Sequence, residues 1–171
     1  MASGDRITRL VADLVKEHGT RDPFALAEAL DIAVYFSDRF DKLKGMYAVI
    51  EGRRCIFINS NLDEPAQKLV CAHEIGHDRL HFEQLGATPV IHEEYLYDSR
   101  DRSEFEANLF AADLLIRTDE LEEYARQGMS IAALAATFGY DEQVINFKLL
   151  AMRRQGYDIP DTISWNTKQV F

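Results

Sequence analysis

The chain has 171 residues, of which 47% are hydrophobic and 28% are charged. This length fits one domain, and the composition excludes a disordered or fibrous protein. The formal net charge of −10 disfavours direct binding to nucleic acid, because a phosphate backbone normally needs a basic protein face. The charge is typical of a solvated acidic surface and suits a basic protein partner.

No segment has the pattern of an export signal or a membrane span. Residues 1–5 lead into an amphipathic stretch, and no run reaches the roughly 18 apolar residues of a transmembrane helix. We therefore expect a cytoplasmic protein with no membrane contact. The two cysteines, Cys55 and Cys71, are too few for a disulfide framework, so we expect buried free thiols.

Hydrophobic spacing predicts a mixture of helices and short strands. Helical spacing covers residues 7–18, 23–30, 65–82, 101–116, 120–126, 131–138 and 142–154. Strand patterns cover residues 32–36, 45–50 and 54–59, and the last two flank a hairpin turn at Gly52. Residues 85–98 lack periodicity and are predicted to be a loop. Because no linker or repeat interrupts the pattern, we expect one domain over 1–171, with a core at 23–116, a helical region at 119–157 and a tail at 158–171.

The sequence His73-Glu74-Ile75-Gly76-His77 matches the H-E-x-x-H pattern, within the helix predicted at 65–82. Residues four positions apart lie on one face of a helix, so both imidazoles can bind one zinc ion. Glu74 lies beside that face, where it can take a proton from water whose pKa the metal lowers from 15.7 to about 7.

Helical phase predicts that both histidines point inward. Their face also carries Ala66, Leu69, Val70 and Leu80, whereas the opposite face carries Gln67, Lys68, Asp78 and Arg79. Buried histidines need partners, and a metal is one such partner. The alternative is two core histidines that are satisfied by hydrogen bonds, but the complete five-residue pattern favours the metal.

A catalytic zinc needs a third protein ligand and an open position. The candidates are Glu104, Glu106, His81 and His92. Glu104 shares a helix face with Asn108, Ala111 and Leu115. The small residues Ala107 and Ala112 flank that face and allow another helix to come close. Glu106 shares its face with Asp113 and Arg117, which is typical of a solvated face. The phase therefore favours Glu104.

The sequence does not fix the roles of several other polar residues near this site. Asn108 either orients a ligand histidine or makes an ordinary polar contact at a helix crossing. His81 lies two turns from His73 and is expected to be a core or pocket-edge histidine. His92, Tyr95 and Tyr97 are each able to stabilise an oxyanion, and the sequence does not choose among them.

With these residues in place, the chain resembles the ImmA/IrrE family of metallo-endopeptidases. The resemblance covers roughly residues 23–116, with a weaker helical region to about residue 157. It is carried by Gly45-Met46-Tyr47, Phe57-Ile58-Asn59-Ser60, Ala72-His73-Glu74-Ile75-Gly76-His77, Leu80-His81 and Glu104-Phe105-Glu106-Ala107-Asn108-Leu109-Phe110-Ala111-Ala112. The two long motifs together are more specific than H-E-x-x-H alone.

The resemblance implies an α+β fold like the minimal zincin core, in which a small sheet with an edge strand lies beside the active helix and further helices surround it. It implies one Zn²⁺ held by His73, His77 and Glu104, with Glu74 as the general base. Short members of the family are often encoded in phages and mobile elements beside a helix-turn-helix repressor, which they cleave. The implied role is therefore that of an antirepressor, whose protein partner is a DNA-binding repressor.

In the expected mechanism, an extended peptide forms hydrogen bonds with a strand edge within residues 46–50 or with the neighbouring strand. Two other functions stay open: a binding module with a structural or vestigial metal, and a zinc hydrolase that acts on a non-peptide amide. Residues 130–152 resemble a helix-turn-helix, but their few basic residues favour packing over DNA contact. The sequence leaves open manganese as the metal, and it leaves open the oligomeric state.

Overall fold

The computed structural model describes residues 3–85, 90–92 and 102–160. Its helices are α1 (Ser3–His18), α2 (Pro23–Ala29), α3 (Glu64–Leu85), α4 (Arg102–Leu115), α5 (Thr118–Arg126), α6 (Ile131–Phe138) and α7 (Glu142–Arg154). Its strands are β1 (Ala33–Ser37), β2 (Gly45–Ile50), β3 (Arg53–Asn59) and β4 (Val90–His92). The predicted helices and the three predicted strands are confirmed, with shifts of a few residues at their ends.

The four strands form one mixed sheet in the order β1-β3-β2-β4. Strand β1 runs parallel to β3, whereas β2 is antiparallel to both β3 and β4. The β2–β3 hairpin turns at Glu51 and Gly52, whose φ angles are 50° and 77°. Positive φ at both central residues is the geometry that matches the twist of a two-residue hairpin, and glycine adopts it without strain.

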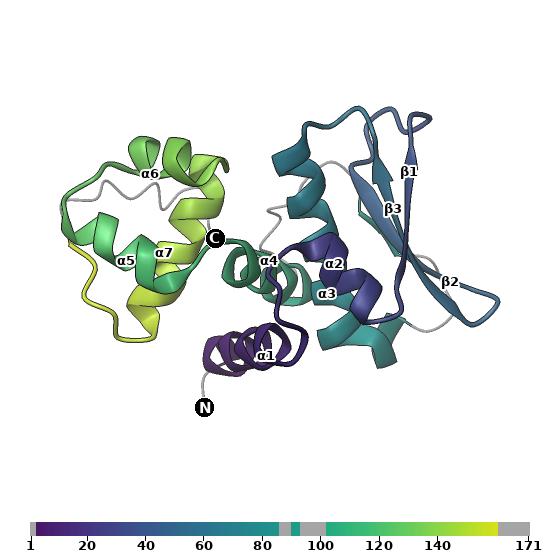
Figure 1. Cartoon of the computed structure of the whole chain (residues 1–171), viewed down its shortest axis with the longest axis horizontal. Helices are drawn as coiled ribbons and strands as arrows, with labels where there is room; N and C mark the ends of the chain where they lie inside the picture. The colour runs from purple at the N-terminus through teal and green to yellow at the C-terminus, as the bar shows by residue number, and fades with distance from the viewer. Residues whose placement is uncertain (1–2, 86–89, 93–101, 161–171) are drawn as a thin grey trace.

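Helices α2 and α3 cover one face of this sheet, and α4 lies between α3 and the group formed by α5, α6 and α7 (Figure 1). Tyr47 of β2 points to the helical face, because its hydroxyl donates to Asp78 of α3 at 2.8 Å. Its cross-strand partner Ile56 is fully buried on the same face. A chain of buried apolar side chains continues from this layer through α4 to α1 and α7.

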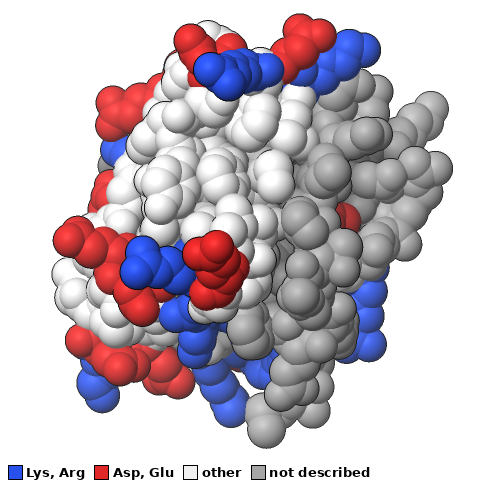
Figure 2. All heavy atoms as spheres, turned by 90° about the vertical axis from the view of Figure 1, so that its right-hand side faces the viewer, with Lys and Arg blue, Asp and Glu red and all other residues white. Residues whose placement is uncertain are grey.

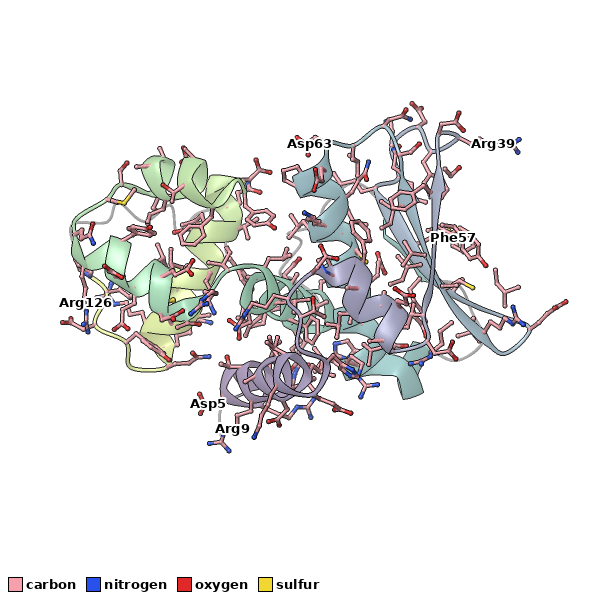
Figure 3. The ribbon with its side chains drawn as sticks, in the orientation of Figure 1. Asp5, Arg9, Arg39, Phe57, Asp63 and Arg126 are labelled. Carbon is pink, nitrogen blue, oxygen red and sulfur yellow. The ribbon has the colours of Figure 1, made fainter. Side chains whose placement is uncertain are left out.

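The opposite face of the sheet is largely uncharged. Phe57, labelled in Figure 3, alternates with Ile56 and points away from the helices, where its ring stacks on Tyr35 with centroids 5.3 Å apart. Figure 2 looks onto this side and shows an area without charged side chains, with Lys, Arg, Asp and Glu above it, below it and to its left.

Strand β4 corrects two expectations. It lies inside residues 85–98, which were predicted to be a loop, because three residues are too short to show an alternating pattern and are held by pairing with β2. This pairing engages Gly45, Met46 and Tyr47, so β2 is an inner strand. An extended peptide therefore has no free edge at Met46, and the edges of the sheet are β1 and β4.

The resemblance of residues 130–152 to a helix-turn-helix agrees with the local geometry but not with an exposed reading helix. Ser130 caps α6 by accepting from Ala133 N at 3.2 Å, and Gly139 ends it with a φ of 74°. Most of α7 is buried, and its Phe147 ring lies 5.0 Å from that of Phe105 on α4. The α7 helix thus packs against α4, as expected from its few basic residues.

None of the helices in the described ranges is long and apolar enough to cross a membrane. Cys55 and Cys71 are both buried and free, as predicted. Burial raises the pKa of the Cys71 thiol well above its usual range, so the group stays neutral and behaves as a small core residue.

Candidate metal centre

Helix α3 carries the H-E-x-x-H residues into the protein interior. Asp63 caps its start by accepting from Ala66 N at 2.9 Å, and Pro65 occupies the first turn. His73, Glu74 and His77 are each only 1% exposed. The two histidines, one turn apart, bring their Nε2 atoms to 3.0 Å from each other, so both rings face the same point.

Helix α4 supplies the third group. Glu104 Oε2 lies 3.3 Å from His73 Nε2, and Glu104 Oε1 lies 3.3 Å from His77 Nε2. The Glu104 side chain is 19% exposed, whereas the side chains of the two histidines are at most 2% exposed. The cluster is therefore approached by solvent from the side of Glu104, which is where a reacting molecule could enter.

Asn108 lies one turn after Glu104 on α4 and contacts the first histidine. Its Oδ1 lies 2.9 Å from His73 Nδ1. An amide oxygen only accepts, so this hydrogen bond requires the ring proton on Nδ1 and leaves the lone pair on Nε2, which faces the cluster. The contact favours the orienting interpretation of Asn108 over that of a polar contact remote from the site.

The three residues fit a single divalent metal ion. His73, His77 and Glu104 each offer one ligand atom, and these atoms all lie within 4.8 Å of one another. Four ligands arranged tetrahedrally about 2.0–2.1 Å from one ion are about 3.4 Å apart, close to the observed separations of 3.0 and 3.3 Å. Two imidazoles and one carboxylate are also a ligand set that leaves the fourth position open.

Glu74 lies between the metal cluster and the sheet. A Cβ atom built on Gly45, at the start of β2, would lie 3.7 Å from Glu74 Oε1 and would clash with Val70. The absence of a side chain at Gly45 therefore lets β2 approach α3 beside the Glu74 carboxylate. Gly45 also pairs with His92, so β4 is the strand next to β2 at this point.

Glu106 does not lie on a solvated face, and this part of the sequence prediction is wrong. Its side chain is buried, accepts from Arg102 Nε at 3.0 Å and lies 3.8 Å from His81 Nε2. Asp113 on the same face is also buried, because Lys148 of α7 pairs with it and Thr8 of α1 donates to it. Helical phase could not reveal this, since the cover comes from other helices. Of the two glutamates, Glu104 is the one that reaches the histidine pair.

His81 is buried at the end of the histidine series, as expected for a core or pocket-edge residue. Its ring centroid lies 5.7 Å from that of His77. His81 is not among the residues whose atoms converge on the cluster formed by His73, His77 and Glu104.

Asp78, assigned by phase to the face opposite the histidines, is also buried. It accepts from the Tyr47 hydroxyl at 2.8 Å and from Arg54 at 3.0 Å, because the sheet covers this side of α3. The sequence analysis missed Tyr47 and Arg54. The only available signal was that both residues fall on the helix-facing side of strands whose other inward residues are apolar.

Tyr95 and Tyr97 lie outside the described residues, and for His92 only the backbone pairing in β4 is described.

The mixed sheet, the buried H-E-x-x-H helix and the facing carboxylate define a zincin-like α+β metallopeptidase fold. The chain belongs to the peptidase family described as the IrrE N-terminal-like domain, which it matches over residues 27–150. Membership of a metallopeptidase family implies a metal ion.

Two relatives support this assignment. The chain is 31% identical over 145 residues to "Uncharacterized immunity region protein 2" of Bacillus phage phi105, which covers 85% of this chain and 90% of that protein. It is 29% identical over 153 residues to "Metallopeptidase ImmA" of Bacillus subtilis (strain 168), which covers 84% of this chain and 83% of that protein. The similarity therefore extends over most of each protein.

Proposed function

We propose that this chain is a zinc-dependent endopeptidase, in which His73, His77 and Glu104 bind the metal and Glu74 is the general base. The observation that carries the proposal is the convergence of the two Nε2 atoms and the Glu104 carboxylate, beside the buried carboxylate of Glu74. The continuous core from α1 to α7 supports a single domain over residues 1–171.

Zinc and the residues around it would have separate roles in the proposed reaction. Zinc bound at this cluster supplies a Lewis acid, which polarises a scissile carbonyl and lowers the pKa of water. Asn108 holds the His73 ring with its Nε2 lone pair toward the cluster. The Glu74 carboxylate accepts a proton from the attacking water, and the resulting carboxylic acid protonates the nitrogen of the leaving amine.

Strand β4 is the proposed docking edge for the scissile segment. It pairs with Gly45, which in turn lies against Glu74, so a peptide added to the outer edge of β4 would pass the general base. Strand addition supplies backbone hydrogen bonds along an extended peptide and leaves its side chains to set specificity.

We propose further that the substrate is a DNA-binding repressor. One relative is named for a phage immunity region and the other is named as a metallopeptidase. A peptidase in that setting would relieve repression by cutting the regulator, and the net charge of −10 suits a basic protein substrate. This role places the protein in the cytoplasm, where the repressor binds DNA.

The test combines metal content with cleavage of a full-length helix-turn-helix repressor encoded beside the gene. Wild type and Glu74→Gln should each hold about one zinc per chain, while cleavage by Glu74→Gln should fall about 10²–10⁴-fold. Glu104→Ala should lose the zinc. Glu106→Ala is the matched control and should keep it, because Glu106 lies on the same helix but faces His81 and is not part of the cluster of His73, His77 and Glu104.

Each variant tests a separate part of the proposal. Wild-type protein that binds no metal after zinc is supplied would refute the peptidase and leave a binding module. Cleavage by Glu74→Gln at the wild-type rate would refute Glu74 as the base. Loss of zinc in Glu106→Ala but not in Glu104→Ala would refute the proposed ligand set.

A further inference from the structure

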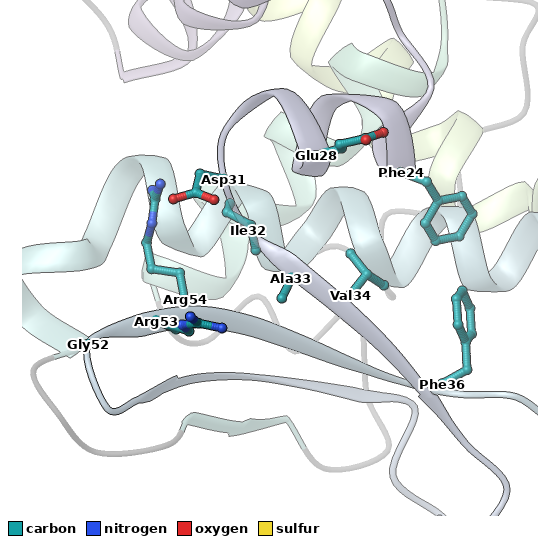
Figure 4. Close-up of a pocket in the computed structure, with 10 residues that line it drawn as sticks. All are labelled: Phe24, Glu28, Asp31, Ile32, Ala33, Val34, Phe36, Gly52, Arg53 and Arg54. Atoms are coloured by element: carbon teal, nitrogen blue, oxygen red, sulfur yellow. The ribbon is translucent and has the colours of Figure 1, made fainter.

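A groove of about 800 Å³ lies at the other edge of the sheet from β4, between α2, β1 and the β2–β3 turn (Figure 4). One end is apolar and is formed by Phe24, Val34 and Phe36, with the rings of Phe24 and Phe36 5.7 Å apart. The rest is bordered by two acidic residues on the side of α2, Glu28 and Asp31, and by the turn at Gly52 with Arg53 and Arg54 on the side of β3.

The backbone of β1 has a free edge along this groove. Ser60 N donates to Ser37 O at 2.9 Å, so the Ser37 carbonyl points toward β3. Backbone groups alternate in direction along a strand, so those of Val34 and Phe36 point away from β3. No strand pairs with that side among the residues that the structure describes. Val34 and Phe36 thus present both their side chains and their hydrogen-bonding groups to the groove.

Strand β1 also lacks the lysine and proline residues that often protect an outer strand. Residues 33–37 contain no lysine and no proline, and Tyr35 and Phe36 are 48% and 53% exposed. Soluble proteins normally blunt such edges with charges, proline or a covering segment. An open, aromatic edge strand beside a groove is the arrangement that takes an added peptide strand.

The charges along the groove specify the kind of peptide. Glu28 and Asp31 are exposed, and within the described part of the chain no ion pair involves either residue. Arg54 is held by Asp78 at 3.0 Å and by the carbonyl oxygen of Leu30. Arg53 is exposed and also lines the groove, so two carboxylates face one exposed guanidinium. A basic side chain placed along the α2 side of the groove would therefore meet Glu28 and Asp31.

We propose that this groove is a second docking site for the protein substrate, separate from the cleavage site. An extended substrate segment would add to the β1 edge, place apolar side chains against Phe24, Val34 and Phe36, and place lysine or arginine side chains against Glu28 and Asp31. This proposal rests on the proposed function, because a DNA-binding repressor carries the basic surface that phosphate contacts require. Attachment at β1 raises the local concentration of the scissile segment at β4.

The first test measures binding alone, in the Glu74→Gln background, so that cleavage does not intervene. The probe is a short fluorescent peptide that alternates lysine and valine, and the comparison peptide alternates glutamate and valine. At low salt the lysine peptide should bind at least about 10-fold more tightly than the glutamate peptide. The amide resonances of Val34 and Phe36 should shift when it binds. Glu28→Gln/Asp31→Asn should remove this preference.

The matched control is Asp13→Asn/Glu17→Gln, which makes the same change in net charge at two exposed carboxylates of α1, a helix that does not line the groove. It should leave the binding of the lysine peptide unchanged. The proposal would be overturned if the two peptides bind equally well, or if both double variants lose the same affinity for the lysine peptide. It would also be overturned if the amide resonances that shift belong to β4 alone. A dimer in solution that Phe36→Ser dissociates would overturn it as well, since a second copy would then cover β1.

The second test uses the active enzyme and the repressor. Glu28→Gln/Asp31→Asn should lower kcat/KM for the full-length repressor about 5-fold or more, while kcat/KM for a short peptide that spans only the scissile bond stays unchanged. An equal loss for both substrates would overturn a separate docking site. The binding test needs no activity, so a failed peptidase proposal and a failed docking proposal give different results.

Discussion

Gly76 meets the backbone of Ala107 so closely that a Cβ atom on Gly76 would lie 3.1 Å from Ala107 Cα and 3.2 Å from its carbonyl oxygen. The same Cβ would lie 3.2 Å from Phe110 Cβ. Gly76 belongs to the H-E-x-x-H segment and Ala107 lies one turn after Glu104. This contact therefore sets the distance at which α4 presents its carboxylate to His73 and His77.

Gly76→Ala should push α4 away from α3 and weaken metal binding. Overpacking of a core costs about 1–3 kcal/mol, which exceeds the gain of about 1 kcal/mol from replacing a helical glycine by alanine. We expect a lower urea midpoint and a zinc affinity reduced about 10-fold or more, since the 3.3 Å separations to Glu104 would lengthen. Chelator competition measures the affinity.

Gly4→Ala on α1 is the matched control for Gly76→Ala. A Cβ atom at Gly4 would lie 3.4 Å from its nearest neighbour, the side chain of Gln155, which can move aside. This variant should be as stable as wild type or more stable, with unchanged zinc affinity. Equal behaviour of the two variants would show that the close approach at Gly76 does not matter.

Asn108→Ala should weaken zinc binding without unfolding the protein. It removes the oxygen that holds His73 Nδ1 at 2.9 Å, so the ring can rotate or take the other tautomer. Outer contacts of this kind are worth about 10–100-fold in metal affinity. Asn108→Asp keeps an acceptor at the same place and should recover most of the loss. Zinc affinity that is unchanged in Asn108→Ala would make Asn108 an ordinary polar contact.

Those parts of the fold that depend on local sequence could be predicted well. Helices α6 and α7 lie where their apolar spacing predicts them. In the structure Ser130 caps the start of α6 and Gly139 ends it in the left-handed region. Strand β4 could not be predicted, because its three residues are held by the partner strand β2 and not by a pattern of their own.

In the candidate site, too, local spacing could be predicted from the sequence, whereas contacts with other helices could not. The i, i+4 spacing of His73 and His77 places both rings on one face, and phase favours Glu104 as the residue that meets them. Phase fails for Glu106 and Asp113, whose burial is caused by residues from other helices, such as His81 and Lys148. One helix alone carries no information about which of its polar faces a neighbouring helix will cover.

The Tyr47→Phe variant should show how much of the pH dependence of stability is caused by the buried Tyr47 hydroxyl and its hydrogen bond to Asp78. Burial, and then the hydrogen bond to Asp78, raise the pKa of Tyr47 well above its usual value. In the unfolded chain Tyr47 loses its proton near pH 10. The folded state therefore keeps a proton that the unfolded state releases, and stability is lost as pH rises beyond about 10.

Tyr47→Phe should be less stable than wild type by about 1–2 kcal/mol near pH 8. Above pH 10 that advantage of wild type should shrink, because phenylalanine has no proton to lose. Urea unfolding of both proteins at several pH values measures the difference, and other titrating groups cancel in the comparison. A difference that stays constant from about pH 8 to 11 would contradict the assigned cause.

The last prediction concerns the buried ion pair between Lys148 of α7 and Asp113 of α4. Both side chains are almost fully buried, at 1% and 3% exposure, and Lys148 Nζ also donates to Thr118 Oγ1 at 2.9 Å. Burial lowers the pKa of Lys148 and the Asp113 carboxylate opposes that effect. The pair therefore depends on both partners, and either charge alone would be buried without compensation.

Lys148→Met should destabilise the protein by about 3–5 kcal/mol, because it leaves the Asp113 carboxylate buried without its cation. Lys148→Met/Asp113→Leu should be more stable than this single variant, since two apolar side chains remove the uncompensated charge and Thr8 keeps its bond to Gln155. Urea unfolding measures both. A single variant within about 0.5 kcal/mol of wild type would show that the ion pair does not hold α7 onto the helix that carries Glu104.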